Sequence, residues 1–196
     1  MNIEKTIRNL ELRGFGVKHF ATGAEASSYL AGSISGTTVG IGGSKTVDTL
    51  GLYDLLCENN TVYWHWKTPS AETRAAANAA PVYLCSVNAL SEDGELLNID
   101  GNGNRLCATS YGTKKVYFVV GTNKIEPDFM SALNRARNVA ARKNAERFGK
   151  KTPCTMDGKC HDCRSSERIC KGLLVLWAPM TGMDVEVVLI DEELGF

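Results

Sequence analysis

Apolar residues along this chain recur first at helical spacing and then in short runs, and the two patterns alternate. At the start, Ile3, Ile7 and Leu10 share one helical face before Gly14 ends the pattern. Similar patterns predict helices at residues 3–13, 22–30, 47–57, 70–80 and 127–148. Apolar runs predict strands at residues 17–20, 38–41, 62–66, 82–86, 96–99, 105–109, 116–121, 173–177 and 185–190. This alternation is typical of a mostly parallel sheet covered by helices, so we predict one α/β domain over residues 1–196.

Composition and charge narrow the class of protein. A chain of 196 residues with 43% hydrophobic and 22% charged residues has enough apolar material for one sizeable core. Basic and acidic residues balance at 22 each, which removes an overall attraction to nucleic acid or anionic membranes. No apolar run of about 18 residues and no apolar signal core appears. We therefore expect a cytoplasmic protein without nucleic-acid or membrane partners, whose oligomeric state the sequence does not predict.

Positive charge is nevertheless concentrated between residues 135 and 151. Glu146 is the only acid among the basic residues Arg135, Arg137, Arg142, Lys143, Arg147, Lys150 and Lys151. One interpretation is the solvated face of a helix and linker. The other is a docking face for a phosphorylated ligand or an acidic partner.

Residues 86–105 are unusually rich in polar side chains and glycine, and they directly follow the apolar run 81–85. Glycines at 94, 101 and 103 leave the backbone accessible at three points. The polar members are Asn88, Asp93, Asn98, Asp100, Asn102, Asn104 and Arg105. This density of donors and acceptors favours a site for a small polar ligand.

A glycine turn at residues 39–46 lies between a predicted strand and a predicted helix. Gly42 and Gly43 let the backbone approach a ligand closely, whereas Ser44 and Thr46 either contact an anion or only cap the helix. The spacing matches neither a P-loop nor a dinucleotide fingerprint.

The carboxyl ends of parallel strands meet at one edge of a sheet, so polar groups that follow different strands should share a pocket. We expect one pocket for a small anionic ligand. Its ligand-binding residues are Gly42, Gly43, Ser44, Thr46, Asn88, Asn98, Asp100, Asn104 and Lys124, with Asp93 in a further wall. Lys124 and Asp93 are the candidate catalytic residues, as acid or base.

Four cysteines lie within residues 152–171 at the spacing C-x5-C-x2-C-x6-C. They are Cys154, Cys160, Cys163 and Cys170. Such a set can hold zinc or an iron–sulfur cluster, with Zn–S distances of about 2.3 Å. Disulfides or free thiols are the alternative, and Cys57, Cys85 and Cys107 are interpreted as small packing residues.

Several motifs together resemble one family. They are Gly-Gly-Ser-Lys-Thr at 42–46, the whole run 86–105, Gly-Thr-Asn-Lys at 121–124, Thr-Pro-Cys at 152–154, Cys-His-Asp-Cys at 160–163 and Arg-Ile-Cys at 168–170. In this combination, which covers nearly the whole chain, the protein resembles the LUD-domain family, which includes lactate-utilisation protein C. The resemblance implies a three-layer α/β/α fold similar to ribose-5-phosphate isomerase, glucosamine-phosphate deaminase and the coenzyme A transferases. It also implies a link to lactate oxidation through iron–sulfur partner proteins.

Three functions compete at this point. The first is a component of lactate or organic-acid utilisation that acts with iron–sulfur redox partners, because the chain carries neither a nicotinamide nor a flavin motif. The second is a stand-alone enzyme on a phosphorylated sugar or acyl thioester. Its weakness is that no nucleophile–base pair is evident, and Asn88 stands where a related isomerase group has an acid. The third is a ligand-sensing domain on the same fold.

Overall fold

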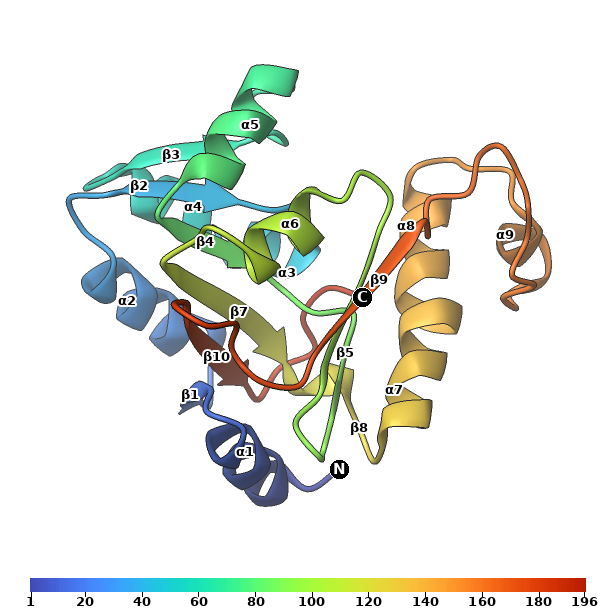
Figure 1. Cartoon of the computed structure of the whole chain (residues 1–196), viewed down its shortest axis with the longest axis horizontal. Coiled ribbons are helices and arrows are strands. Elements are labelled where there is room, and N and C mark those ends of the chain that lie inside the picture. The colour runs from blue at the N-terminus through green and yellow to red at the C-terminus, as the bar shows by residue number, and fades with distance from the viewer.

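The computed structural model describes residues 1–196 and has a central parallel sheet between two layers of helices (Figure 1). The six strands run parallel in the order β1-β10-β7-β4-β2-β3. Their bounds are β1 (Gly16–Phe20), β2 (Thr38–Ile41), β3 (Thr61–Trp64), β4 (Val82–Cys85), β7 (Lys115–Gly121) and β10 (Asp184–Ile190). The predicted three-layer α/β fold is therefore confirmed.

Successive residues of β7 pack on opposite faces of this sheet, which gives two cores. Phe118 and its alternate neighbours join a core with α1 (Ile3–Leu12), α5 (Ala71–Ala79) and α6 (Asn104–Ser110). Tyr117 and Val119 join the opposite core with α2 (Gly23–Ser33), α3 (Lys45–Thr49) and α4 (Leu52–Cys57). Strands that are buried on both faces explain the unbroken apolar runs of the sequence.

A smaller sheet stands beside the main one and was not predicted as a separate unit. Its order is β8-β5-β6-β9, with bounds β5 (Ala89–Ser91), β6 (Leu96–Asp100), β8 (Ile125–Glu126) and β9 (Gly172–Leu176). One long helix packs on this sheet through Ala132, Ala136 and Ala141. The helix consists of α7 (Phe129–Arg135), a π-helical segment (Ala136–Ala141) and α8 (Arg142–Arg147), within the predicted 127–148.

The predicted strand at 105–109 is wrong, because these residues form α6. The Asp100 carboxylate accepts a hydrogen bond from Arg105 N at 3.1 Å, and Gly103 adopts a φ of +82° immediately before the helix. This local cap outweighs the strand-like composition of the segment. The predicted helix 47–57 is two helices, α3 and α4, separated at Gly51 (φ +64°).

The short helix α9 (Pro153–Asp157) was not predicted and precedes an irregular segment that runs to Lys171. None of the helices combines the length and apolar character needed to cross a membrane.

Candidate functional site

Lys124 is the most buried charged side chain at the carboxyl edge of the main sheet. It ends the short 3-10 turn Thr122–Lys124 that follows β7, and it is 3% exposed. Its amine donates hydrogen bonds to Thr46 Oγ1 (2.9 Å), Ser86 Oγ (2.9 Å) and the carbonyl oxygen of Val87 (3.2 Å). These partners follow β2 and β4, so three adjacent strands deliver one polar cluster to this edge.

No carboxylate forms an ion pair with the Lys124 amine; all three hydrogen-bond partners are neutral oxygens. Burial, and then the positive charges of Arg135 and Arg105, lower the pKa of Lys124 to about 7. An amine with this pKa can release or take up a proton near neutral pH, and its charged form lacks a counter-ion. The site is thus suited to an anion or to proton transfer.

The glycine turn is fixed by packing around its backbone. Trp64 Nε1 donates to the carbonyl oxygen of Gly42 at 3.1 Å. Ser44 Oγ accepts from Val47 N at 3.2 Å, so this hydroxyl caps α3. Thr46 Oγ1 contacts Lys124 and also donates to the carbonyl oxygen of Leu194. The turn therefore holds Thr46 in contact with the Lys124 amine. Ser44 caps α3, which is one of the two roles that the sequence allowed for it.

Asp100 organises the loop between β6 and α6. Its carboxylate accepts hydrogen bonds from the backbone N–H groups of Gly101, Asn102 and Arg105, and it lies 3.3 Å from Arg105 Nε. The Arg105 guanidinium also donates to Asn98 Oδ1 and to the Ile99 carbonyl oxygen. Asp100 thereby fixes the loop and the direction of the Arg105 side chain.

We expect Asp100→Ala to reduce the free energy of unfolding by about 2–4 kcal/mol, because it leaves three backbone N–H groups without their acceptor and the largely buried Arg105 guanidinium without a carboxylate. Urea denaturation measures this change. The exposed Asp54 provides a control, and Asp54→Ala should change stability by less than about 0.5 kcal/mol. Equal stabilities of the two variants would contradict the organising role of Asp100.

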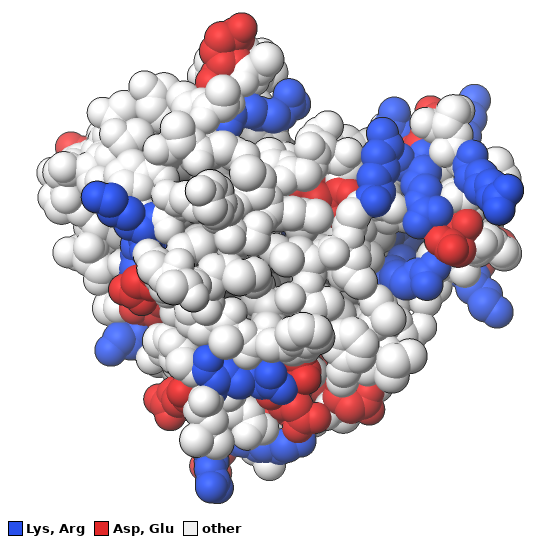
Figure 2. All heavy atoms as spheres, in the orientation of Figure 1, with Lys and Arg blue, Asp and Glu red and all other residues white.

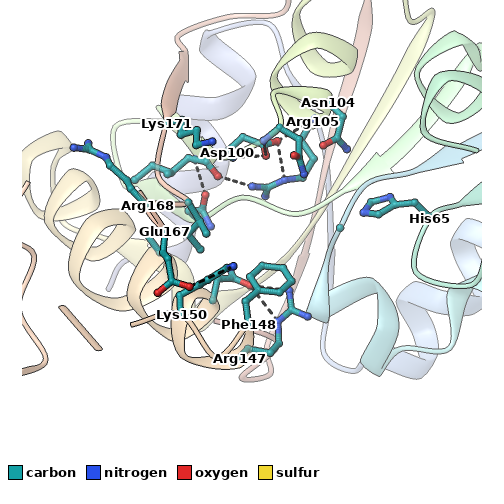
Figure 3. Close-up of a pocket in the computed structure, with 18 of the residues that line it drawn as sticks. His65, Asp100, Asn104, Arg105, Arg147, Phe148, Lys150, Glu167, Arg168 and Lys171 are labelled. Carbon is teal, nitrogen blue, oxygen red and sulfur yellow. Dashed lines mark hydrogen bonds and ion pairs between the residues drawn. The ribbon is translucent and has the colours of Figure 1, made fainter. Parts of the chain in front are cut away.

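A cleft of about 390 Å³ opens beside this cluster (Figure 3). Five basic and two acidic side chains line it: Arg105, Arg147, Lys150, Arg168, Lys171, Asp100 and Glu167. Basic side chains also gather over α8 and the segment that follows it on the surface (Figure 2). The excess of positive charge makes the cleft attractive to anions.

His65 lies across the cleft from Glu167 and Arg168 (Figure 3), and Trp66 also lines the cleft. Burial, followed by the positive charge of Arg74, lowers the pKa of His65, so the imidazole is biased towards its neutral form. The Arg147 guanidinium lies 4.6 Å from the centre of a Trp66 ring and 4.1 Å from that of Phe148. Arg147 thus lies over aromatic rings at the cleft wall, and its guanidinium forms no ion pair with a carboxylate.

A smaller cavity adjoins the cleft, and the two share Gly43, Asn88, Arg105 and Asn144. Lys124, Ser44 and Ser86 line this smaller cavity. The structure therefore brings most of the predicted residues together: Gly43, Ser44, Asn88, Asp100, Asn104 and Lys124 line one or both spaces.

Four predicted residues lie behind or away from these walls. Thr46 is fully buried and contacts the Lys124 amine from inside the protein. Gly42 packs against the side chains of Arg105 and Tyr83. Asn98 is 2% exposed and supports Arg105 from behind. Asp93 pairs with Lys5 of α1 at 2.8 Å, at the far turn of the β5–β6 hairpin. Its predicted place in the anion pocket is wrong, and a proton-transfer role beside Lys124 is lost with it.

Sequence reasoning missed the opposite half of the cleft. His65 and Trp66 fall within the predicted strand 62–66, and residues 166–171 fall within the cysteine segment, so neither pattern indicated that they line a cleft. The cluster of basic residues at 135–151 was the available signal. Arg147 and Lys150 of that cluster line the cleft, whereas Arg135 is buried and donates to the carbonyl oxygens of Asn88 and Asn123.

The four predicted metal ligands lie outside this cleft, around a second cavity on the far side of Arg168 and Ile169. Cys154, Cys160, Cys163 and Cys170 all line that cavity as free, half-buried thiols. Their sulfur atoms do not form a ready ligand set of three or more. Whether they bind metal stays a prediction.

Comparisons with known proteins address the family. No curated protein sequence matches the chain. Among solved structures, it is similar to the crystal structure of a DUF162 family protein from Deinococcus radiodurans, with a TM-score of 0.57 and 12% identity over 96% of this chain and 95% of that one. At this identity the likeness concerns the fold alone. The LUD domain profile matches residues 3–190, nearly the whole chain. The chain belongs to the LUD-domain family.

Proposed function

We propose that this protein is a LUD-domain component of lactate or related organic-acid utilisation, which binds a small organic anion in the cleft and works in the cytoplasm with iron–sulfur redox partners. Family membership and the resemblance described above support the metabolic part of the proposal. The cleft geometry supports the ligand class, because its lining is predominantly basic.

The carrying observation is the buried Lys124 amine, which has three neutral oxygen partners and no counter-ion. A carboxylate that enters beside it would supply the missing negative charge in a region of low dielectric. Binding of an anion would also favour the charged amine. We therefore expect ligand binding above pH 7 to be coupled to the uptake of up to about one proton.

Calorimetric titration tests this directly with L-lactate and pyruvate at pH 8, in two buffers with different ionisation enthalpies. The wild type is expected to bind at least one of the acids with proton uptake. Lys124→Met should weaken binding at least about tenfold and remove the proton uptake.

Lys143 lies on the exposed side of α8 and provides the matched control, so Lys143→Met should bind as the wild type does. Failure of the folded wild type to bind either acid would refute the ligand class. Unchanged binding by Lys124→Met would refute the role of the amine. Deleting the gene and growing cells on lactate tests the metabolic part, and normal growth would contradict it.

One observation favours the second candidate, a stand-alone enzyme on a phosphorylated sugar or acyl thioester. An amine with a pKa of about 7 is well matched to general acid–base catalysis at neutral pH. The assay is turnover of sugar phosphates and acyl thioesters by the isolated chain. Turnover that disappears in Lys124→Met would replace the first proposal with this one.

A further inference from the structure

The segment from α9 to β9 has almost no hydrophobic support of its own. Residues 158–171 contain neither helix nor strand, and no residue from 153 to 175 is buried. Ordering such a length of chain costs conformational entropy that burial of apolar surface normally offsets. Small structural units without a core generally depend on disulfides or metal ions for their stability.

Four cysteines are the distinctive side chains of this segment, and folding brings all of them to one cavity. Cys154 lies on α9, whereas the other three come from the irregular backbone. The opposite wall is formed by Ala141 and Ala145 of the long helix, together with Arg137. The thiols are separated by up to 16 positions in the chain. Their spacing alone therefore does not place them together, and it is the fold that brings them to one cavity.

The charges around this cavity suit a set of thiolates. Arg137 and Arg168 both line it, and both form ion pairs with Asp162, at 3.3 and 2.9 Å. Two guanidinium groups thus share one carboxylate, which leaves an excess of positive charge. A metal centre with four cysteine thiolates carries net negative charge, and these arginines would compensate for it.

Backbone contacts connect the same segment to the cleft. Arg168 donates to the carbonyl oxygens of Cys163 and Cys170, and it lines both the cysteine cavity and the cleft. Lys171 N donates to the carbonyl oxygen of Asp100 at 2.9 Å. At the other end, Cys160 N donates to Asn138 Oδ1 on the π-helical segment. The position of the cysteines therefore determines the position of one cleft wall.

We infer that Cys154, Cys160, Cys163 and Cys170 together bind one metal centre, a zinc ion or an iron–sulfur cluster, which holds residues 158–171 in place as a wall of the cleft. The sulfur atoms line one cavity without forming a closed ligand set, and binding of the metal would draw them together. The inference does not depend on the ligand of the cleft or on a role in lactate utilisation.

The experiment uses the full chain, purified without oxygen after expression with zinc or with iron. Elemental analysis and acid-labile sulfide give the composition, and the visible spectrum separates the two centres because zinc is colourless. The expected result is about one zinc per chain, or iron with matching sulfide, and loss of this metal in Cys163→Ser. Cys107 is an exposed cysteine on α6, and Cys107→Ser should keep the metal.

Removing the metal from the wild type with a chelator gives a second test, which does not depend on whether the Cys163→Ser variant folds. Removal of metal should speed alkylation of the four thiols at least about tenfold, as read by mass spectrometry, while Cys107 is unaffected. It should also increase proteolysis within residues 158–171. A metal-free chain whose four thiols react as fast as Cys107 would overturn the inference, and so would disulfides among the four.

Discussion

Replacing Gly40 with alanine is expected to prevent folding, or to lower the free energy of unfolding by more than about 3 kcal/mol. Gly40 lies within β2, where a Cβ would stand 2.0 Å from the carbonyl oxygen of Ala77 on α5 and under 3.0 Å from two further backbone atoms. A helix backbone cannot rotate aside as a flexible side chain can. The strand and helix would separate, and the glycine turn that follows β2 would shift with them. Soluble yield and urea denaturation measure the effect.

Gly32 on α2 is the matched control, because a Cβ there would meet nothing within 4 Å. Gly32→Ala should stabilise the protein by about 0.5–1 kcal/mol through helix propensity. If Gly40→Ala were as stable as Gly32→Ala, the close approach of β2 and α5 would not exist in solution.

The second large effect is a dependence of stability on pH that arises from Lys124. In the folded chain its pKa is about 7, against an ordinary value of 10.5, so above pH 7 the unfolded chain binds one proton more than the folded chain does. Stability should therefore rise with pH through this window, by up to about 1.4 kcal/mol per pH unit. Below pH 7 both states are protonated, and the unfavourable contribution of the buried charge is constant and largest.

Lys124→Met should remove this slope. The measurement is the difference in unfolding free energy between wild type and variant from pH 7 to about 8.5. This window stops below the range in which Cys85 and Tyr83 act in the opposite direction, because burial raises the pKa values of both groups. Lys143→Met controls for the loss of an exposed amine. A wild type and a Lys124→Met variant with parallel pH profiles would show that the amine keeps its ordinary pKa.

Hydrophobic periodicity predicted the layers because both faces of the main sheet are buried. The apolar runs of β4, β7 and β10 follow directly from that burial. Periodicity failed where short-range hydrogen bonds decide the structure, as at α6, whose start is fixed by the Asp100 carboxylate. Strands of two or three residues, such as β8 and β5, are too short to give a pattern.

The site could be predicted only from the rule that polar residues after the carboxyl ends of parallel strands meet at one edge of the sheet. That rule applies to Lys124, Thr46 and Ser86, which follow adjacent parallel strands and meet at one amine. It does not apply to Asp93, because residues 86–105 contain an antiparallel hairpin, β5–β6, which carries its turn away from the edge where Asn88 and Asp100 lie. The far wall of the cleft is formed by residues 166–171, whose position depends on tertiary packing. No local sequence pattern predicts that position.

The strand order also constrains how the chain can be made. Strand β1, near the N-terminus, pairs only with β10, which follows every other strand in sequence and lies between β1 and β7. During synthesis β1 has no strand to pair with until residues 184–190 have left the ribosome, and α1, which packs beside it, has no completed sheet to cover. The edge of β7 is equally open over that interval, and it is an apolar template for pairing with other chains. Pairing of β10 with both β1 and β7 is therefore the step that completes the main sheet, and this step brings together the most distant parts of the chain.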